Sequence, residues 1–221
     1  MAHRSNRWSI RGTPVFSREA LKRDASSEVT FVLSEAAATP VEVRMVPVGS
    51  AADTGTAWGL EENTGNEVRA SYTATGQEPE GLYEVLARAE DAAGNRSGWL
   101  RVGLVSLDLS VPRVMDELGV VLSPALAGVG QAVLLSLTVS EPPSGLPVLT
   151  ASAGAQVTTW PPGAPLLAGD GTATLTFSTV VRPGQGGVYA LALSGLMDAA
   201  GNAAQAWSGP VFKVDEAPPG V

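Results

Sequence analysis

Carboxylate and amide side chains recur at matched places in the two halves of the chain, and they are the residues best suited to chemistry. The run Asp91-Ala92-Ala93-Gly94-Asn95 has a second copy in Asp198-Ala199-Ala200-Gly201-Asn202, and Asp108 and Glu141 add further carboxylates. Oxygen ligands of this kind, mixed with carbonyls and water, suit Ca²⁺. The same aspartates can instead cap turns by accepting backbone N–H bonds. Both interpretations stay open at this point.

Residues that could carry catalysis are scarce. The single histidine is His3, close to the N-terminus, so a Ser-His-Asp arrangement has no other base. The sequence holds no Gly-x-Ser-x-Gly elbow. Neither Lys22 nor Lys213 follows a glycine, so there is no phosphate-binding P-loop. We therefore expect a chain that is not an enzyme, with no cofactor other than possible Ca²⁺.

Composition narrows the remaining classes. Of 221 residues, 44% are hydrophobic and 16% charged, which favours a globular chain with a buried core. The net charge of −8 argues against nucleic acid as a partner, because phosphate binding needs a basic face. No apolar run approaches the ~20 residues of a transmembrane helix. The first residues carry charge without an apolar core behind it, so we expect either a cytosolic chain or a piece of a longer exported one.

The elements that hold these residues come from an internal repeat. Gly81-Leu82-Tyr83 matches Gly187-Val188-Tyr189, and each precedes one copy of the Asp-Ala-Ala-Gly-Asn run. The pairs Ser34-Glu35 and Ser140-Glu141 lie 106 positions apart. Several landmarks in the same order predict two homologous domains.

Alternation of apolar residues predicts strands that bury one face. The inward positions of the first copy are Val29, Phe31, Leu33, Val68, Ala70, Tyr72, Tyr83, Val85, Ala87 and Ala89. Those of the second are Leu175, Phe177, Tyr189, Leu191 and Leu193. We expect a bulge at Gly195, where the second copy has one extra residue, and short helical turns at 17–23 and 115–118.

The two Asp-Ala-Ala-Gly-Asn runs predict hairpin turns. Aspartate accepts backbone N–H bonds, while glycine and asparagine tolerate positive φ. The residues expected to shape these turns are Asp91, Gly94, Asn95, Asp198, Gly201 and Asn202.

Together, these motifs resemble the bacterial immunoglobulin-like (Ig-like) repeats of surface and adhesin proteins. The resemblance rests on a strand ending in Ser-Glu, Gly-x-Tyr opening a strand that ends in Asp-x-Ala-Gly-Asn, and an Asp-x-x-x-Pro linker. It covers the chain from about Thr13 to Pro219. It implies an all-β fold of two tandem Ig-like Greek-key β-sandwiches. It also implies that Tyr83 and Tyr189 take the corner position, with the ring inside and the hydroxyl bonded to backbone.

The expected boundaries follow from the repeat. Residues 1–13 form a basic N-terminal arm, 14–107 the first domain, 108–112 a linker, 113–214 the second domain, and 215–221 a second linker copy. Family members serve as spacers or adhesive modules, often in series. The resemblance therefore implies a non-catalytic extracellular or cell-surface module, whose partners are neighbouring Ig-like domains or subunits and possibly a surface glycan or protein.

In such a sandwich the incoming linker lies at the same end as two of the turns. That arrangement would bring Asp108 near Glu141, Asp198 and Asn202, a possible Ca²⁺ site at the junction. The first domain has Gly12-Thr13-Pro14 where the linker aspartate would stand, so it offers no equivalent group.

Two other functions remain open. Trp58, Trp99, Trp160 and Trp207 could make the chain an accessory carbohydrate-binding pair of a secreted enzyme, although packing roles are favoured because they recur in both copies. Alternatively, the arm from Ala2 to Thr13 could pair with the sheet edge of a neighbouring subunit in an extracellular filament.

Overall fold

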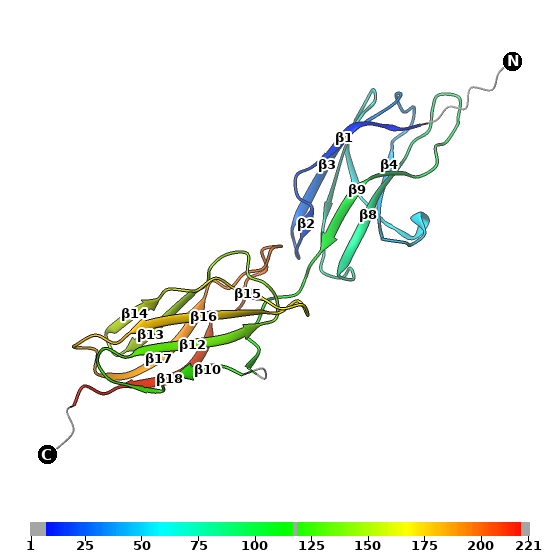
Figure 1. Cartoon of the computed structure of the whole chain (residues 1–221). Helices are drawn as coiled ribbons and strands as arrows, with labels where there is room; N and C mark the ends of the chain where they lie inside the picture. Colours follow the sequence, from blue (N-terminus) through cyan, green and yellow to red (C-terminus); the bar gives the residue numbers. More distant parts are fainter. Residues whose placement is uncertain (1–7, 117–118, 218–221) are drawn as a thin grey trace. The chain divides into compact units, whose positions relative to one another are not determined.

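The computed structural model describes residues 8–116 and 119–217, which form two separate compact units (Figure 1). Unit 1 is Met1–Leu109 and unit 2 is Ser110–Val221, so the division lies within the segment 108–112. Each unit encloses its own cluster of buried apolar side chains.

Unit 1 is a sandwich of two sheets. The four-stranded sheet has the order β1 (Ile10–Phe16), β3 (Ser26–Leu33), β7 (Glu67–Thr73) and β6 (Gly59–Thr64). The five-stranded sheet has the order β2 (Ala20–Leu21), β9 (Leu100–Leu107), β8 (Gly81–Arg88), β4 (Glu42–Pro47) and β5 (Thr56–Ala57). A short 3₁₀ turn, η1 (Ala52–Thr54), leads into β5.

Unit 2 repeats this plan. Its four-stranded sheet has the order β10 (Val121–Ser123), β12 (Ala132–Val139), β16 (Ala173–Val180) and β15 (Leu166–Leu167). Its five-stranded sheet has the order β11 (Leu126–Ala127), β18 (Trp207–Val214), β17 (Gly187–Ser194), β13 (Val148–Ala153) and β14 (Gln156–Trp160). Neighbouring strands are antiparallel except for β2 with β9 and β11 with β18.

This strand order is the Greek-key order of the immunoglobulin fold, with two antiparallel sheets packed face to face. The chain is therefore all-β, with two tandem Ig-like sandwiches, as the sequence predicts. No helix among the described residues has the length and apolar character needed to cross a membrane.

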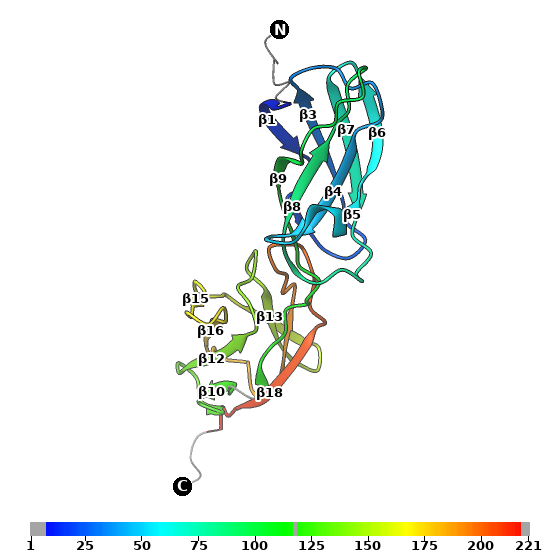
Figure 2. The same cartoon turned by 90° about the vertical axis from the view of Figure 1, so that its right-hand side faces the viewer.

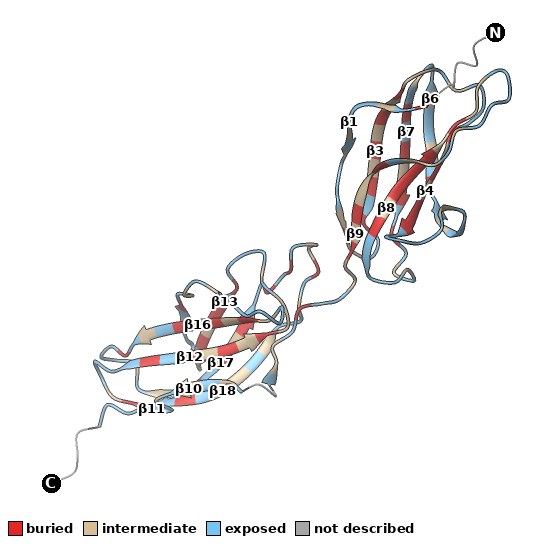
Figure 3. Cartoon of the chain, turned by 45° about the vertical axis from the view of Figure 1, so that its right-hand side comes forward, coloured by how far each residue is buried: buried red, intermediate tan, exposed pale blue. Residues whose placement is uncertain are grey.

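The predicted alternation produces the core in both units. Val29, Phe31 and Leu33 on β3 point into unit 1, with Glu28, Thr30 and Val32 on the other side. Tyr189, Leu191 and Leu193 play the same part on β17. Figure 3 shows the resulting banding of buried and exposed positions along the strands.

Two local predictions were wrong, and a third falls partly outside the described residues. Residues 17–23 contain no helical turn. Instead, Ala20–Leu21 form β2, because Leu21 is fully buried beside the last strand. The irregular pairing of β17 lies between Ala190 and Ala192, whereas Gly195 follows the strand with φ of 72°. The turn expected at 115–118 falls partly on residues 117–118, which lie outside the described residues.

The boundary of the basic arm also needs correction. Residues 1–7 lie outside the described part of the chain, but β1 begins at Ile10 and is the edge of the four-stranded sheet (Figure 2). Ile10 pairs with Leu33, Arg11 pairs with Val32, and Trp8 is buried in the core. Residues 10–13 therefore belong to the first sandwich, because their backbone completes its sheet.

Candidate functional site

The Asp91 turn of unit 1 is held by its own side chains. Asp91 Oδ1 accepts hydrogen bonds from the backbone N–H groups of Ala93 and Asn95, each at 2.9 Å. Asn95 Nδ2 donates to Asp91 Oδ2 at 2.9 Å. Gly94 adopts φ of 82°, which glycine reaches without strain. This aspartate therefore acts as a turn cap.

The Asp198 turn of unit 2 has the same bonds in a drier setting. Asn202 donates its backbone N–H to Asp198 Oδ1 at 2.8 Å and its Nδ2 to Asp198 Oδ2 at 2.7 Å. Asp198 is only 2% exposed and Asn202 only 8%, whereas Asn95 is exposed. A buried carboxylate needs such partners, because an unsatisfied buried charge is costly.

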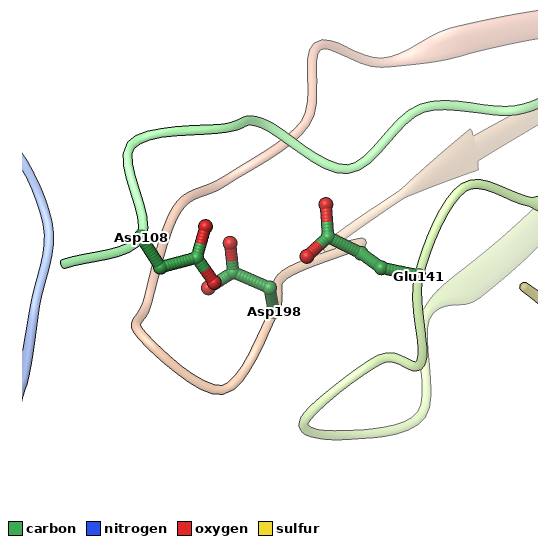
Figure 4. A group of neighbouring side chains, drawn as sticks. All are labelled: Asp108, Glu141 and Asp198. Carbon is green, nitrogen blue, oxygen red and sulfur yellow. The ribbon is translucent and has the colours of Figure 1, made fainter. Parts of the chain in front are cut away.

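Of the four residues predicted to bind calcium, the three that carry carboxylates lie close together. Asp108, on the connecting segment, and Glu141 and Asp198, in unit 2, each offer an oxygen within 4.8 Å of the others (Figure 4). Asp198 and Glu141 follow strands β17 and β12, so the turns after these strands bring them near. Asn202 belongs to the same turn as Asp198, and its amide nitrogen already donates to that carboxylate. The arrangement provides hard oxygen ligands of the type Ca²⁺ uses.

The two corner tyrosines differ in their partners. Both rings are buried, and the Tyr83 hydroxyl donates to the backbone oxygen of Pro79 at 2.6 Å. The Tyr189 hydroxyl instead donates to the side-chain Oε1 of Gln156 at 2.6 Å. The expectation of a backbone acceptor was therefore wrong for Tyr189. The sequence did not reveal this because Gln156 lies on a distant strand, β14.

Unit 1 contains a pocket that the sequence did not indicate. Its volume is about 510 Å³, and its lining includes Met45, Pro47, Tyr72, Glu78, Pro79 and Tyr83. The carboxylate of Glu78 accepts hydrogen bonds from the Tyr72 hydroxyl, from the backbone and hydroxyl of Thr75, and from the N–H groups of Gly76 and Gln77. These donors leave the carboxylate little capacity for a ligand.

The protonation of Glu78 follows from these bonds. Burial by itself raises the pKa of this carboxyl, but the hydrogen bonds from Tyr72 and from backbone N–H groups outweigh it and lower the pKa to about 2. Conversely, burial and the bond to Glu78 raise the pKa of the Tyr72 hydroxyl. Neither group exchanges a proton near neutral pH, where general acid–base catalysis would need one. The role of the pair is therefore structural, since its hydrogen bonds hold the loop that carries Glu78 in place.

The tryptophans proposed as a carbohydrate platform are mostly engaged in packing. Trp58 stacks on Tyr72 with centroids 5.8 Å apart, and Trp160 meets Phe212 edge-on at 5.3 Å. The guanidinium of Arg88 lies 4.4 Å from the ring centroid of Trp99. In unit 2, Trp207 Nε1 donates to Asp116 Oδ1 at 3.1 Å. These contacts favour structural roles.

Comparison with known proteins adds little beyond this geometry. The sequence matches no family model and no curated protein. One similar solved structure is described as an anomalous substructure of Titin-A168169, with 15% sequence identity. The alignment covers 94% of this chain and 100% of that one, with a TM-score of 0.31. The fold assignment rests on strand order alone.

Proposed function

We propose that the chain is a non-catalytic structural and adhesive module of an exported bacterial tandem Ig-like array, acting as a stalk or in cell-surface adhesion. The observation that carries the proposal is the duplication. Two sandwiches have the same strand order, separate cores, and the same Asp-to-Asn turn after the same strand. Units that each enclose their own core suit a spacer, because each can fold without help from the next.

The parent open reading frame tests the array. We expect an export signal upstream and further units with Gly-x-Tyr and Asp-x-Ala-Gly-Asn landmarks at a spacing near that found here. A reading frame that encodes a catalytic domain beside this pair would favour the accessory carbohydrate-binding role instead. A frame with neither an export signal nor further units would contradict the array.

Adhesion is tested with the protein itself. Beads coated with the folded chain should attach to host-cell monolayers or to immobilised surface glycans, whereas beads coated with urea-unfolded chain should not. Equal attachment of both bead types would show non-specific sticking and would contradict an adhesive role.

Calcium binding is a separate proposal, supported by the grouping of Asp108, Glu141 and Asp198. Titration calorimetry should detect Ca²⁺ binding, and Ca²⁺ should raise the melting temperature relative to a chelator. The double variant Asp108→Asn, Glu141→Gln removes two charges but keeps the Asp198 turn, so it should fold and lose the shift. If the wild type shows no shift at millimolar Ca²⁺, or if the double variant shows the same shift, no calcium site exists there.

A further inference from the structure

Charged residues are distributed unequally between the two units. Unit 2 contains only three basic residues, Arg113, Arg182 and Lys213, out of 14 in the chain. It also has fewer than half of the 22 acidic residues: Asp116, Glu117, Glu141, Asp170, Asp198, Asp215 and Glu216. From Pro142 to Gly169 there is no charged residue at all, and this run includes β13, β14 and β15. One side of the second sandwich is therefore neutral on an acidic chain.

The strands at the corresponding side of unit 1 are guarded against pairing. The edge strand β6 carries Glu61 and Glu62, and its pairing with β7 shifts register between Leu60 and Glu62. The other edge strand, β5, has only two residues. Charges, bulges and very short edge strands are the devices by which natural sheets avoid edge-to-edge association.

Of these three protections, the edge strands β14 and β15 of unit 2 show only one, a very short strand. Strand β15 is as short as β5, but β14 has five residues and is the outermost strand of its sheet. Its sequence, Gln-Val-Thr-Thr-Trp, contains no charge and no proline, and it pairs with β13 without a register shift. Its β-branched residues favour extended structure. This edge is ready to accept another strand.

The hairpin geometry determines which backbone groups face outward. Ala153 pairs with Gln156 across the two-residue turn Gly154-Ala155 and closes the ladder. In a two-residue hairpin the closing pair is hydrogen-bonded, and hydrogen-bonded pairs alternate with non-bonded pairs along an antiparallel ladder. The N–H and C=O groups of Val157 and Thr159 consequently point away from β13, toward the open edge.

We propose that β14 is a self-association edge, through which two copies of this chain join antiparallel with Thr158 opposite its counterpart. This register places Val157 of each copy opposite Thr159 of the other. Both residues present outward N–H and C=O groups, so each such pair exchanges both of its hydrogen bonds. The two five-stranded sheets then become one continuous sheet with a two-fold axis at Thr158.

A second copy is the occupant that the charges favour. Net charge of −8 makes copies repel one another over most of their surface, but the edge from Gln156 to Trp160 brings no charge to the contact. An acidic or basic peptide would find no charge partner along this strand. Five residues extend only about 17 Å, and interfaces burying less than about 1,000 Å² are weak or transient. So short an edge gives a weak association. We expect dimers mainly where the local concentration of copies is high, as on the cell surface of the proposed array.

Sedimentation of the full chain at increasing concentration tests the edge. We expect reversible dimers, and Val157→Lys should lower the association constant at least tenfold, because lysine is a natural edge guard. The matched control is Val188→Lys on β17, an interior strand of the same sheet. Val157 is 63% exposed and Val188 is 60% exposed, so neither change disturbs the core. Val188→Lys should dimerise as the wild type does.

A crosslink tests the register. The chain contains no cysteine, so Thr158→Cys introduces the single thiol. Opposed residues of a non-hydrogen-bonded pair have Cα atoms about 4.5 Å apart, a separation that a disulfide spans. Mild oxidation with diamide should give a disulfide dimer of Thr158→Cys well before one of Val188→Cys.

These measurements also define failure. A chain that stays monomeric up to about 1 mM, a concentration that detects even millimolar affinities, would overturn the proposal. Equal loss of dimer in Val157→Lys and Val188→Lys would assign association to the sheet face. Equal crosslinking rates of the two cysteine variants would also overturn the edge register.

Discussion

The two Asp-to-Asn turns have the same hydrogen bonds but differ in burial. Asp198 and Asn202 are buried, whereas Asn95 is exposed and Asp91 is half-buried. In unit 1 the turn lies between Glu90 and Arg96, which pair as ions at 3.0 Å. In unit 2, Met197 and Ala203 form the corresponding bridge, and neither is charged. The same motif is thus an exposed turn in one unit and a buried turn in the other.

This difference predicts unequal costs of removing the asparagine. Asn202→Ala should destabilise unit 2 by about 1–3 kcal/mol, because it leaves a buried carboxylate short of partners. Asn95→Ala, the matched control in unit 1, should cost about 1 kcal/mol or less, since water replaces the lost donor. Native-state hydrogen exchange of the full chain measures the free energy of unfolding of each unit from its slowest core amides. Equal costs in the two units would contradict the burial argument.

The lowered pKa of Glu78 predicts that unit 1 loses stability at acid pH. Its pKa is lowered to about 2 in the folded chain, against an ordinary value of 4.5. A lowered carboxyl pKa contributes stability that is present above the ordinary value and is lost as pH falls through the folded pKa. Unit 1 should therefore lose stability between about pH 4.5 and 2.

The variant Glu78→Gln gives the control for this titration. It removes the charge but keeps an acceptor oxygen, so it should be less stable at pH 7 and have a flatter pH profile between pH 5 and 2. Urea unfolding at a series of pH values measures both. A variant with the wild-type profile would assign the acid sensitivity to other carboxylates.

Some of these side-chain contacts can be predicted from the sequence and others cannot. The spacing from Asp91 to Asn95 and from Asp198 to Asn202 predicts turns, because their hydrogen bonds are local. The Tyr189 acceptor and the Tyr72–Glu78 pair depend on which loops and strands meet in space. Periodicity does not encode such contacts, so they required the structure.

At the scale of elements, alternation predicts the long central strands best. Tyr83 to Ala89 alternate inward and outward, and the structure places Tyr83, Val85, Ala87 and Ala89 in the core. Strands β1 and β2 were not predicted. The repeat starts the first domain at residue 14 and so assigns residues 10–13 to the arm, whereas β1 begins at Ile10. Strand β2 has only two residues. Edge strands are defined by the backbone of a neighbour more than by their own side chains.

Two glycines show how a side chain lies over a strand. A Cβ on Gly209 of β18 would approach the Trp207 ring to 2.5 Å, and one on Gly103 of β9 would approach the Phe16 ring to 2.4 Å. In each unit an aromatic ring therefore takes the space that a side chain on the last strand would fill.

Gly209→Ala should displace the Trp207 indole and destabilise unit 2 by about 1–3 kcal/mol, the usual cost of overpacking. Tryptophan fluorescence should shift to longer wavelength as the ring becomes wetter, and urea unfolding gives the cost. Gly169→Ala is the control, since nothing lies within 4 Å of its added carbon. A neutral Gly209→Ala would show that the ring moves aside freely.

For the whole molecule, the unequal number of charged residues in the two units predicts unequal responses to salt. Unit 1 carries a linked set of ion pairs in which Glu42 meets Arg88 and Arg96, each at 2.9 Å. Such partly exposed pairs contribute about 0–1 kcal/mol each, and 1 M salt shortens the screening length to about 3 Å. Raising NaCl to 1 M should therefore lower the stability of unit 1 relative to unit 2 by about 1 kcal/mol.

Hydrogen exchange at low and high salt measures this difference within one sample, because both units experience the same solvent. Arg88→Met keeps an apolar stem over Trp99 but removes the charge, so most of the salt response of unit 1 should disappear in this variant. A salt response that is equal in the two units would contradict the assignment to these pairs.

The parallel pairing of β2 with β9 and of β11 with β18 has a mechanical consequence. Backbone bonds from Ser106 to Glu19 and from Asp108 to Leu21 tie β2, the second strand of unit 1, to its last strand. Bonds from Lys213 to Ala125 and from Asp215 to Ala127 do the same in unit 2. Tension applied at the two ends of a unit would pull these strands in opposite directions along their axes. The bonds would then bear the load together as a shear joint, whereas antiparallel terminal strands would unzip one bond at a time.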